Sequence, residues 1–413
     1  MSNSKTRKAC SLCECKKLIN IFSFGKSPLA NNLVKSKAKQ KTYPLKVVAC
    51  SSCKHLQLKH IIDSKILFSK YLYTTSVSEE FVSHFQDYAK DIKKNFFNKN
   101  SDNNNLLDIG SNDGCFLKEL NNSKIKAYGV EPAKNLYKIC KAQGLNIFNN
   151  FFDKKFATKL KKEKLFFKAI TANNVFAHID NLNRVVKNIK KLLTNDGVFV
   201  FEVSYLRDVI EKQIFDTFYH EHLSYHSLEP LDKFFKKHSM IIFDVKRIKT
   251  HGGSIRVYVS NDKNTKAKQS VMNLLKKEET SSLNSVNNIR LFFKNVTMLK
   301  KNIAYFLNSI IKNKKGLIGY GAPAKAVTIL NFCNISNNAI KYIVEDSKIK
   351  QGYFMPNFMI PIVSKQTLIK NNINFKFVVI FAWNYYKKII SNNINFFKNK
   401  KVYILLPKIK RVN

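Results

Sequence analysis

Acidic side chains are scarce in this sequence of 413 residues. It contains 28 Asp and Glu residues against 72 Lys and Arg residues, for a formal net charge of +44. A field of that strength attracts nucleic acid, membrane surfaces and phosphorylated ligands alike. The lysines, however, are spread among Asn, Ile and Phe along the whole chain, as in a genome that drifts towards A and T codons, and form no single basic stripe. The charge therefore names no partner, and we predict that nucleic acid is not one.

Long apolar runs are also missing. No stretch reaches the roughly 18 apolar residues that a membrane helix needs, and the start, MSNSKTRKACSLCECKK, has no apolar signal region. The sequence therefore predicts a cytoplasmic protein that does not engage a membrane. Its length exceeds what one hydrophobic core usually serves, so we expect two or three domains.

The eight cysteines are unevenly placed, and five of them lie near the start. A disulfide framework is not expected, because the cytosol keeps thiols reduced. Cys10 with Cys13 and Cys50 with Cys53 share the C-x-x-C spacing, which turns two sulfurs towards one ion and predicts a closed, structural zinc site. Cys15 is an alternative ligand that we treat as spare, and ordinary free thiols are the competing interpretation.

Helical and strand patterns alternate after the cysteine-rich segment. An amphipathic helix is expected within about residues 71–100, before a strand that ends in the turn DIGSNDG (108–114). Apolar runs and helical stretches then alternate as far as GVFVFEVSY (197–205). After a lysine-rich helical stretch at about residues 263–314, a second series begins with GLIGYGAPAKAVTIL (316–330). This alternation predicts an α/β protein with parallel strands and helical crossovers.

The turn DIGSNDG keeps a carboxylate at the end of its strand. Asp108, Gly110 and Gly114 form the pattern D-x-G-x-x-x-G, whereas a pyrophosphate site favours bare backbone amides. A cationic ligand suits Asp108 better, and S-adenosylmethionine carries an ammonium, a sulfonium and a ribose diol. Glu131, at the end of the next strand, is placed to accept both ribose hydroxyls. Together the glycine turn and this acidic residue predict an S-adenosylmethionine site.

Eight motifs in this order resemble the three-domain sugar C-methyltransferases that act on nucleotide-linked 4-keto-deoxysugars. They are CSLC, FGKSPLANNLV, YPLKVVACSSC, DIGSNDG, NNVFAHIDN, FDTFYHEHLSYHSL, HGGSIRVYV and GYGAPAKAVTILNF. The resemblance covers nearly the whole chain. It implies a zinc-binding module (1–70), a Rossmann-like methyltransferase domain (71–250) and a second Rossmann-like, substrate-binding domain (251–413). The sugar nucleotide would lie between the last two.

The resemblance also implies site residues by motif match. The S-adenosylmethionine site would comprise Asp108, Gly110, Ser111, Asn112, Gly114, Glu131 and Asn173. The sugar site would include Tyr73, Asn174 and His178, with His222 of YHEH as the general base. Tyr71 is an equally close alternative to Tyr73.

Chemistry on carbon requires the residue types that YHEH contains. A C–H group must lose its proton to a base, and the neighbouring ketone must take the charge as an enolate. Tyr219 can donate a hydrogen bond to the enolate oxygen, His222 can take the proton near neutral pH, and Glu221 can polarise a partner. A metal shared by His220 and His222 is a weaker alternative.

Two later motifs suggest substrate contacts. In HGGSIRVYV, a turn followed by a strand, Ser254 and Arg256 are candidates, and Arg256 is expected to reach a diphosphate unless it is merely the exposed arginine of a hairpin. In GYGAPAK, Lys325 lies near a helix N-terminus, a natural phosphate site. An NAD site is disfavoured there, because lysine replaces the third glycine of the dinucleotide fingerprint.

The sequence thus predicts a C-methyltransferase that uses S-adenosylmethionine, contains structural zinc and methylates C3 beside the ketone. The alternatives are O-methylation of another small metabolite, a nucleic-acid-binding zinc protein and a scaffold without activity. The identity of the sugar and nucleotide, the stereochemistry and the oligomeric state stay open.

Overall fold

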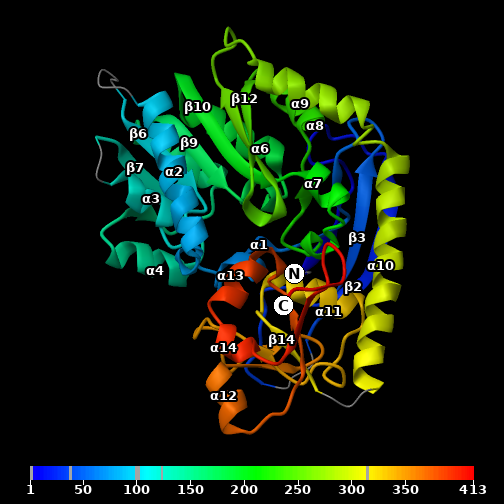
Figure 1. The fold of residues 1–413 in the computed structure, drawn as a ribbon. Coiled ribbons are helices and arrows are strands. Elements are labelled where there is room, and N and C mark those ends of the chain that lie inside the picture. The colour runs from blue at the N-terminus through cyan, green and yellow to red at the C-terminus, as the bar shows by residue number, and fades with distance from the viewer. Residues whose placement is uncertain (1–2, 37–39, 98–102, 122–123, 313–315) are drawn as a thin grey trace.

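The computed structural model describes residues 3–36, 40–97, 103–121, 124–312 and 316–413. Within these residues the strands form two sheets of seven strands, one of four and one of two. Figure 1 shows the two large sheets in the upper and lower parts of the molecule, with the N-terminal strands at their side. This confirms the expected α/β class with a small cysteine-rich module and two Rossmann-like sheets.

The cysteine-rich module is built on an antiparallel four-stranded sheet in the order β11-β4-β3-β2. Its edge strand β11 comes from far along the chain and directly follows YHEH, with Ser224 opposite Gln57. The catalytic candidates are therefore tied to the N-terminal module by backbone hydrogen bonds. The elements are β1 (Ser4–Thr6), β2 (Leu18–Ser27), β3 (Tyr43–Cys50), β4 (Leu56–Leu58), β5 (His60–Ile62), α1 (Ser64–Phe68) and β11 (Ser224–Tyr225).

The central sheet has the order β12-β13-β10-β9-β6-β7-β8, and β6 is parallel to both of its neighbours, β7 and β9. The strand order therefore reverses at β6, and ligands of open α/β sheets bind beyond the carboxyl ends of the strands at such a point. The strands are β6 (Asn105–Ile109), β7 (Lys126–Val130), β8 (Asn146–Phe148), β9 (Phe167–Asn173), β10 (Leu193–Ser204), β12 (Ile241–Ile248) and β13 (Ser254–Ser260).

Strand β13 pairs antiparallel with β10 and β12, so residues 254–260 belong to the central sheet. The expected division between the second and third domains at residue 250 thus separates strands that are hydrogen-bonded to one another. The pairing of β13 with β10 joins segments far apart in sequence, and local patterns do not show it.

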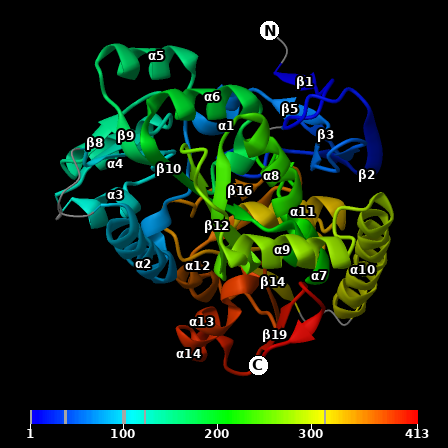
Figure 2. The ribbon, with the colours of Figure 1, turned by 90° about the horizontal axis from the view of Figure 1, so that it is seen from above.

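Helices cover both faces of the central sheet, as Figure 2 shows. Successive residues of a strand point to opposite faces, so Leu106 is buried with α2 and α3 whereas Leu107 is buried with α5 and α6. The expected helix within residues 71–100 is α2, which begins after Ser78. The helices are α2 (Glu79–Phe96), α3 (Cys115–Leu120), α4 (Lys134–Ala142), α5 (Lys154–Lys162), α6 (Leu182–Leu192), α7 (Leu206–Glu211), α8 (Leu228–Lys237) and α9 (Gln269–Thr280).

The C-terminal sheet has the order β16-β17-β15-β14-β18-β19-β20, and β14 lies parallel between β15 and β18. Its strands are β14 (Leu317–Tyr320), β15 (Ile343–Val344), β16 (Phe354–Met355), β17 (Ile360–Val363), β18 (Phe377–Ile380), β19 (Lys401–Ile404) and β20 (Lys410–Arg411). The helices that precede or accompany it are α10 (Val286–Lys312), α11 (Ala324–Phe332), α12 (Lys365–Lys370), α13 (Tyr386–Ser391) and α14 (Ile394–Phe397). None of the helices described is long and apolar enough to cross a membrane.

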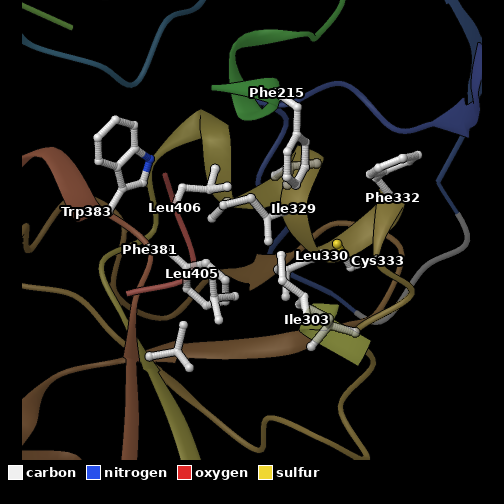
Figure 3. Packing of buried hydrophobic residues seen from close by; sticks show 14 of the residues in the cluster. Phe215, Ile303, Ile329, Leu330, Phe332, Cys333, Phe381, Trp383, Leu405 and Leu406 are labelled. Atoms are coloured by element: carbon white, nitrogen blue, oxygen red, sulfur yellow. The ribbon is translucent and has the colours of Figure 1, made fainter. Parts of the chain in front are cut away.

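One hydrophobic cluster joins the three parts of the chain. Phe215, just before YHEH, reaches towards Ile329 and Phe332 of α11 (Figure 3), and the rings of Phe215 and Phe332 are 5.4 Å apart. The Thr328 hydroxyl donates to the Phe218 carbonyl at 3.1 Å. Helix α11 is thereby held against the segment that carries the catalytic candidates.

Candidate active site and zinc site

Four cysteine sulfurs converge in the N-terminal module. Those of Cys10, Cys13, Cys50 and Cys53 all lie within 4.8 Å of one another, with 3.6 Å between Cys10 and Cys53 and 3.4 Å between Cys13 and Cys50. Tetrahedral zinc with Zn–S bonds of about 2.3 Å places its sulfurs roughly 3.8 Å apart. The four thiols therefore fit the ion, while the Cys15 sulfur lies next to the Ser51 hydroxyl at 3.6 Å.

The two C-x-x-C turns share one backbone conformation. Glu14 donates its N–H to the Cys10 carbonyl at 3.1 Å, and Lys54 donates to the Cys50 carbonyl at 3.1 Å. Both donors have positive φ angles, 66° and 64°. This repeated turn aims both sulfur pairs at one point, and a hydrogen bond from Cys53 lowers the pKa of Cys10 to about 5, which favours the thiolate that binds metal.

A cavity of about 850 Å³ lies between the carboxyl ends of the two large sheets. Most of the predicted site residues line it: Tyr73, Asp108, Gly110, Ser111, Asn112, Glu131, Asn173, Asn174, His178, Tyr219, His222 and Lys325. Four others do not line it in the described part of the chain: Gly114, Glu221, Ser254 and Arg256. These predicted site residues come from the second and third predicted domains, and Asn31 of the N-terminal module lines the same cavity.

Asp108 is a buried carboxyl group at the end of β6. Its Oδ1 accepts hydrogen bonds from the Thr171 hydroxyl at 2.6 Å and from the Asn173 amide at 3.3 Å. Burial raises the pKa of Asp108 to about 7, and none of the groups found to shift it is basic. A buried carboxyl group without a cationic partner suits a positively charged ligand such as the methionine end of S-adenosylmethionine.

Glu131 closes the turn from the next strand. Its two carboxyl oxygens accept the N–H groups of Asn112 at 2.9 Å and Ala133 at 2.8 Å, and burial raises its pKa to about 7. Gly110 has a φ of 71°, and a Cβ there would lie 2.5 Å from Val175 Cγ2. Backbone rather than a side chain therefore borders the cavity at Gly110. Gly114 begins α3 with a φ of 80° and supports the turn from behind.

Asn112 and Asp113 fasten the segment after α1 over the turn. The Asn112 side chain accepts the Thr75 N–H at 3.0 Å and donates to the Tyr73 carbonyl at 3.1 Å, while Asp113 accepts from the Ser76 hydroxyl at 2.6 Å. These bonds position Tyr73 on the cavity wall next to the predicted cofactor site.

Tyr219 and His222 form a hydrogen-bonded pair on the opposite wall. The Tyr219 hydroxyl lies 2.7 Å from His222 Nε2, and His222 Nδ1 lies 2.9 Å from the Thr217 carbonyl oxygen. Because a carbonyl only accepts, the proton is on Nδ1 and Nε2 accepts from Tyr219. Burial lowers the pKa of His222 well below its usual value, so the ring is neutral. A neutral imidazole can act as a base at Nε2 once that nitrogen releases the hydrogen bond from Tyr219.

Two other histidines near this pair have different surroundings. The His178 ring stacks on His222 with centroids 5.1 Å apart, and burial lowers its pKa to about 4. His220 points its Nε2 towards the Pro44 carbonyl at 3.4 Å and does not line the cavity. The structure therefore gives no support for a metal shared by His220 and His222.

Glu221 lies behind the wall and holds two residues that do line it. The Asn31 amide donates to its carboxyl oxygens at 2.8 and 2.7 Å, and the Tyr71 hydroxyl donates at 3.1 Å. Burial raises the pKa of Glu221 to about 7. Sequence reasoning assigned no role to Asn31, although it lies in the motif FGKSPLANNLV. Both tyrosines of YLY face the cavity, and Tyr71 is the one that contacts Glu221.

Ser254 and Arg256 lie on β13 inside the protein, which corrects the expectation that they contact substrate. The Arg256 side chain donates to Glu202 at 2.6 Å and to Asp91 at 3.3 Å, and its guanidinium stacks over the Tyr88 ring at 3.8 Å. The Ser254 hydroxyl donates to the Thr250 carbonyl at 3.1 Å. Arg256 is thus committed to buried carboxylates and cannot reach a diphosphate in this arrangement.

Three sequence families match the chain in succession. They are described as a zinc binding domain (residues 10–68), a methyltransferase domain (81–238) and a C-methyltransferase C-terminal domain (249–407). The C-methyltransferase NovU of Streptomyces niveus is 27% identical over 394 residues, which are 94% of this chain and 93% of that protein.

Two solved structures are similar to part of the chain. An S-adenosylmethionine-dependent methyltransferase from Clostridium acetobutylicum ATCC 824 is 15% identical, with 43% of this chain and 91% of that chain covered and a TM-score of 0.35. The PH0226 protein from Pyrococcus horikoshii OT3 is 15% identical, with 48% and 97% covered and a TM-score of 0.37. Both similarities are weak.

The site and the matched domains define the class of the protein: it is a methyltransferase that depends on S-adenosylmethionine. More narrowly, the chain resembles C-methyltransferases: it matches in succession a zinc-binding domain, a methyltransferase domain and a C-methyltransferase C-terminal domain, and it is similar over nearly its whole length to a C-methyltransferase.

Proposed function

We propose that this enzyme methylates C3, the carbon next to the ketone, of a nucleotide-linked 4-keto-deoxysugar. The observation that carries the proposal is the Tyr219–His222 pair, which lines the same cavity as Asp108 and Glu131. Methylating carbon requires a base for the C–H proton and a donor for the developing oxyanion. The pair contains one of each, next to the predicted methyl-donor site.

The hydrogen bonds indicate how the proton would move. Without substrate, the Tyr219 hydroxyl donates to His222 Nε2. A ketone oxygen that takes over this hydroxyl as its donor frees Nε2 for the C3 proton. The C–H electron pair then moves to the ketone oxygen and forms the enolate. The Thr217 carbonyl keeps the imidazole in place and stabilises the charge that the ring acquires.

The remaining wall residues would position the two ligands. Asp108 would hold the cationic methionine end of S-adenosylmethionine and Glu131 its ribose, and S-adenosylmethionine supplies a methyl group that is activated by its sulfonium charge. Asn31 and Tyr71, both fixed by Glu221, present polar groups to the sugar side, together with Asn174 and His178. A cavity of about 850 Å³ lies at the upper end of the usual range for ligand pockets, as two ligands require.

Exchange of the C3 proton with solvent tests the proposal. Incubated in D2O with a panel of keto-sugar nucleotides and S-adenosylhomocysteine, the wild type should incorporate deuterium at C3. With S-adenosylmethionine it should methylate the same carbon. His222→Ala should lose both activities by roughly 100-fold or more, because a positioned base contributes about 10²–10⁴ in rate. Its affinity for S-adenosylhomocysteine should stay within about twofold.

His60→Ala is the matched control, because His60 lies on β5 outside the cavity and its loss should leave both rates unchanged. Methyl transfer to oxygen, without any exchange at carbon, would contradict the proposal. An unaltered rate in His222→Ala would remove His222 from the mechanism.

A further inference from the structure

Lys325 differs from the other basic residues that line the cavity. Lys5 pairs with Asp180 at 2.6 Å, and Lys350 donates to the Ala322 carbonyl at 3.0 Å. Lys65 and Arg184 are exposed to solvent. The Nζ of Lys325, by contrast, is buried and has no hydrogen-bond partner among the described residues.

The described residues around the Lys325 ammonium contact it but accept no hydrogen bond from it. Nζ lies 5.4 Å from the centroid of the Trp383 ring, within the range of a cation–π contact. The Trp383 indole N–H donates to Asp216 Oδ2 at 2.7 Å, while Asp216 Oδ1 is also buried without a partner. A buried ammonium with unused donors is costly for the fold, so an anionic ligand atom in the cavity is the partner it lacks.

Lys325 reaches the catalytic wall because of how the C-terminal sheet is placed. It lies at the start of α11, beyond the carboxyl end of β14, where that sheet reverses its strand order. Helix α11 contacts the segment 215–218 through Phe215 and Phe218. Burial lowers the pKa of both His222 and His251, and the positive charge of Lys325 adds to each shift, so the ammonium lies near the base.

We propose that Lys325 is a catalytic residue that donates a hydrogen bond from its ammonium to the ketone oxygen and stabilises the enolate. The proposal rests on the proposed function and adds a second donor beside Tyr219. As the C3–H bond breaks, the proton goes to His222 Nε2 and the electron pair to the ketone oxygen. That oxygen then receives hydrogen bonds from Tyr219 and Lys325, and both would be retained until C3 bonds to the methyl carbon. The S–CH3 bond would break with its electron pair left on sulfur, and the carbonyl would return.

The charges around Lys325 favour an enolate over a diphosphate. A diphosphate carries at least two negative charges and is usually met by several cations or backbone amides. The residues that flank Lys325 here are the neutral imidazoles of His222 and His251 and the carboxyl group of Asp216. This arrangement matches one negative charge, and it is the charge that develops only during the reaction.

The decisive variant is Lys325→Met, which keeps the length of the side chain and removes its charge. Deuterium exchange at C3 and methylation should fall together by about 100-fold, the loss expected for an oxyanion donor. The Kd for the nucleoside diphosphate alone and for S-adenosylhomocysteine should change less than about threefold. Lys325→Arg should restore part of the exchange rate. Lys348→Met removes the same charge from an exposed position of the same domain and should behave as wild type.

Thermal unfolding separates catalysis from a structural role. Because Lys325 has no hydrogen-bond partner among the described residues, Lys325→Met should unfold at the same or a higher temperature than wild type. A lower Tm of Lys325→Met together with full activity would overturn the assignment. Weaker binding of the nucleoside diphosphate with an unchanged kcat would also overturn it. If the wild type neither exchanges nor methylates any keto-sugar, the proposed function fails and this role of Lys325 fails with it. An active wild type with an equally active Lys325→Met overturns the role of Lys325 alone.

Discussion

The two large sheets border the cavity with the same local arrangement of a glycine turn and an acidic residue. In each, a glycine turn follows the first strand, and an acidic residue after the second strand accepts an N–H of that turn: Glu131 from Asn112 at 2.9 Å, and Glu345 from Ala322 at 2.8 Å. In each, the turn lies where the strand order reverses. The backbone framework is therefore shared between the two sheets.

The sheets differ in the charge that they present to the cavity. The central sheet presents the buried carboxyl group of Asp108, and the C-terminal sheet presents Lys325, whose buried Nζ has no hydrogen-bond partner among the described residues. The first suits a cationic methyl donor, and the second an oxyanion on the acceptor. A common backbone framework thus sets the place of binding, and one side chain sets the sign of the ligand.

Replacing the carboxyl group should have the largest effect on this contrast. Asp108→Asn keeps the size of the side chain and removes its charge. Binding of S-adenosylmethionine should therefore become less favourable by about 2–3 kcal/mol, which is typical of a hydrogen bond to a charged group. Lys325→Met should leave this affinity within about twofold. Isothermal titration calorimetry measures both. Equal losses in the two variants would mean that the sheets do not divide the ligands by charge.

The glycine of the central turn should have the next largest effect. Gly110→Ala forces a side chain into a positive φ and towards Val175, whereas Gly144→Ala meets the same backbone cost with no atom within 4 Å of its Cβ. We expect Gly144→Ala to lower the free energy of unfolding by about 1–2 kcal/mol. Gly110→Ala should cost more and also weaken S-adenosylhomocysteine binding. Denaturant unfolding measures the free energy of unfolding of both variants. Equal values would show that the Val175 side chain moves aside at no cost.

Short-range patterns predicted much of the fold and of the site. The C-x-x-C pairs, the Asp108 turn and the order of strands and helices depend on neighbours in sequence, and the structure places them as expected. Arg256 was misplaced for a different reason. Its partner Glu202 lies directly opposite on β10, and this register is set by strand pairing across more than fifty residues. No local motif records such a pairing.

Contacts between domains were the other gap. Asn31 binds Glu221 across 190 residues of sequence, and Lys325 is brought to His222 by the packing of α11. The residue types were visible in FGKSPLANNLV and GYGAPAK, but their partners were not. Sequence reasoning therefore assigned Lys325 to a phosphate by its helix position, whereas its surroundings in the fold favour a single oxyanion.

The pH dependence of cofactor binding should be the smallest effect. It tests the role of Asp108 in the central sheet without any substitution. The pKa of Asp108 is about 7, so the carboxyl group is largely protonated at pH 6 and ionised at pH 8. A cation binds the ionised form, and affinity for S-adenosylmethionine should therefore rise with pH by at most about tenfold per unit below the pKa and level off above it. Asp108→Asn should flatten that rise.

The contribution of Asp108 to the stability of the protein without ligand changes with pH in the opposite direction to its contribution to cofactor affinity. The pKa of Asp108 is raised by folding, so its contribution to stability is present below its ordinary pKa and is lost as the pH rises through about 7. The increase in Tm caused by S-adenosylmethionine should consequently grow from pH 6 to pH 8. Adenosine, which lacks the cationic methionine end but can contact Glu131, serves as the control and should show a weaker dependence. A shift that is constant or shrinks over this range would show that Asp108 does not meet the cation, and the charge contrast between the sheets would then rest on Lys325 alone.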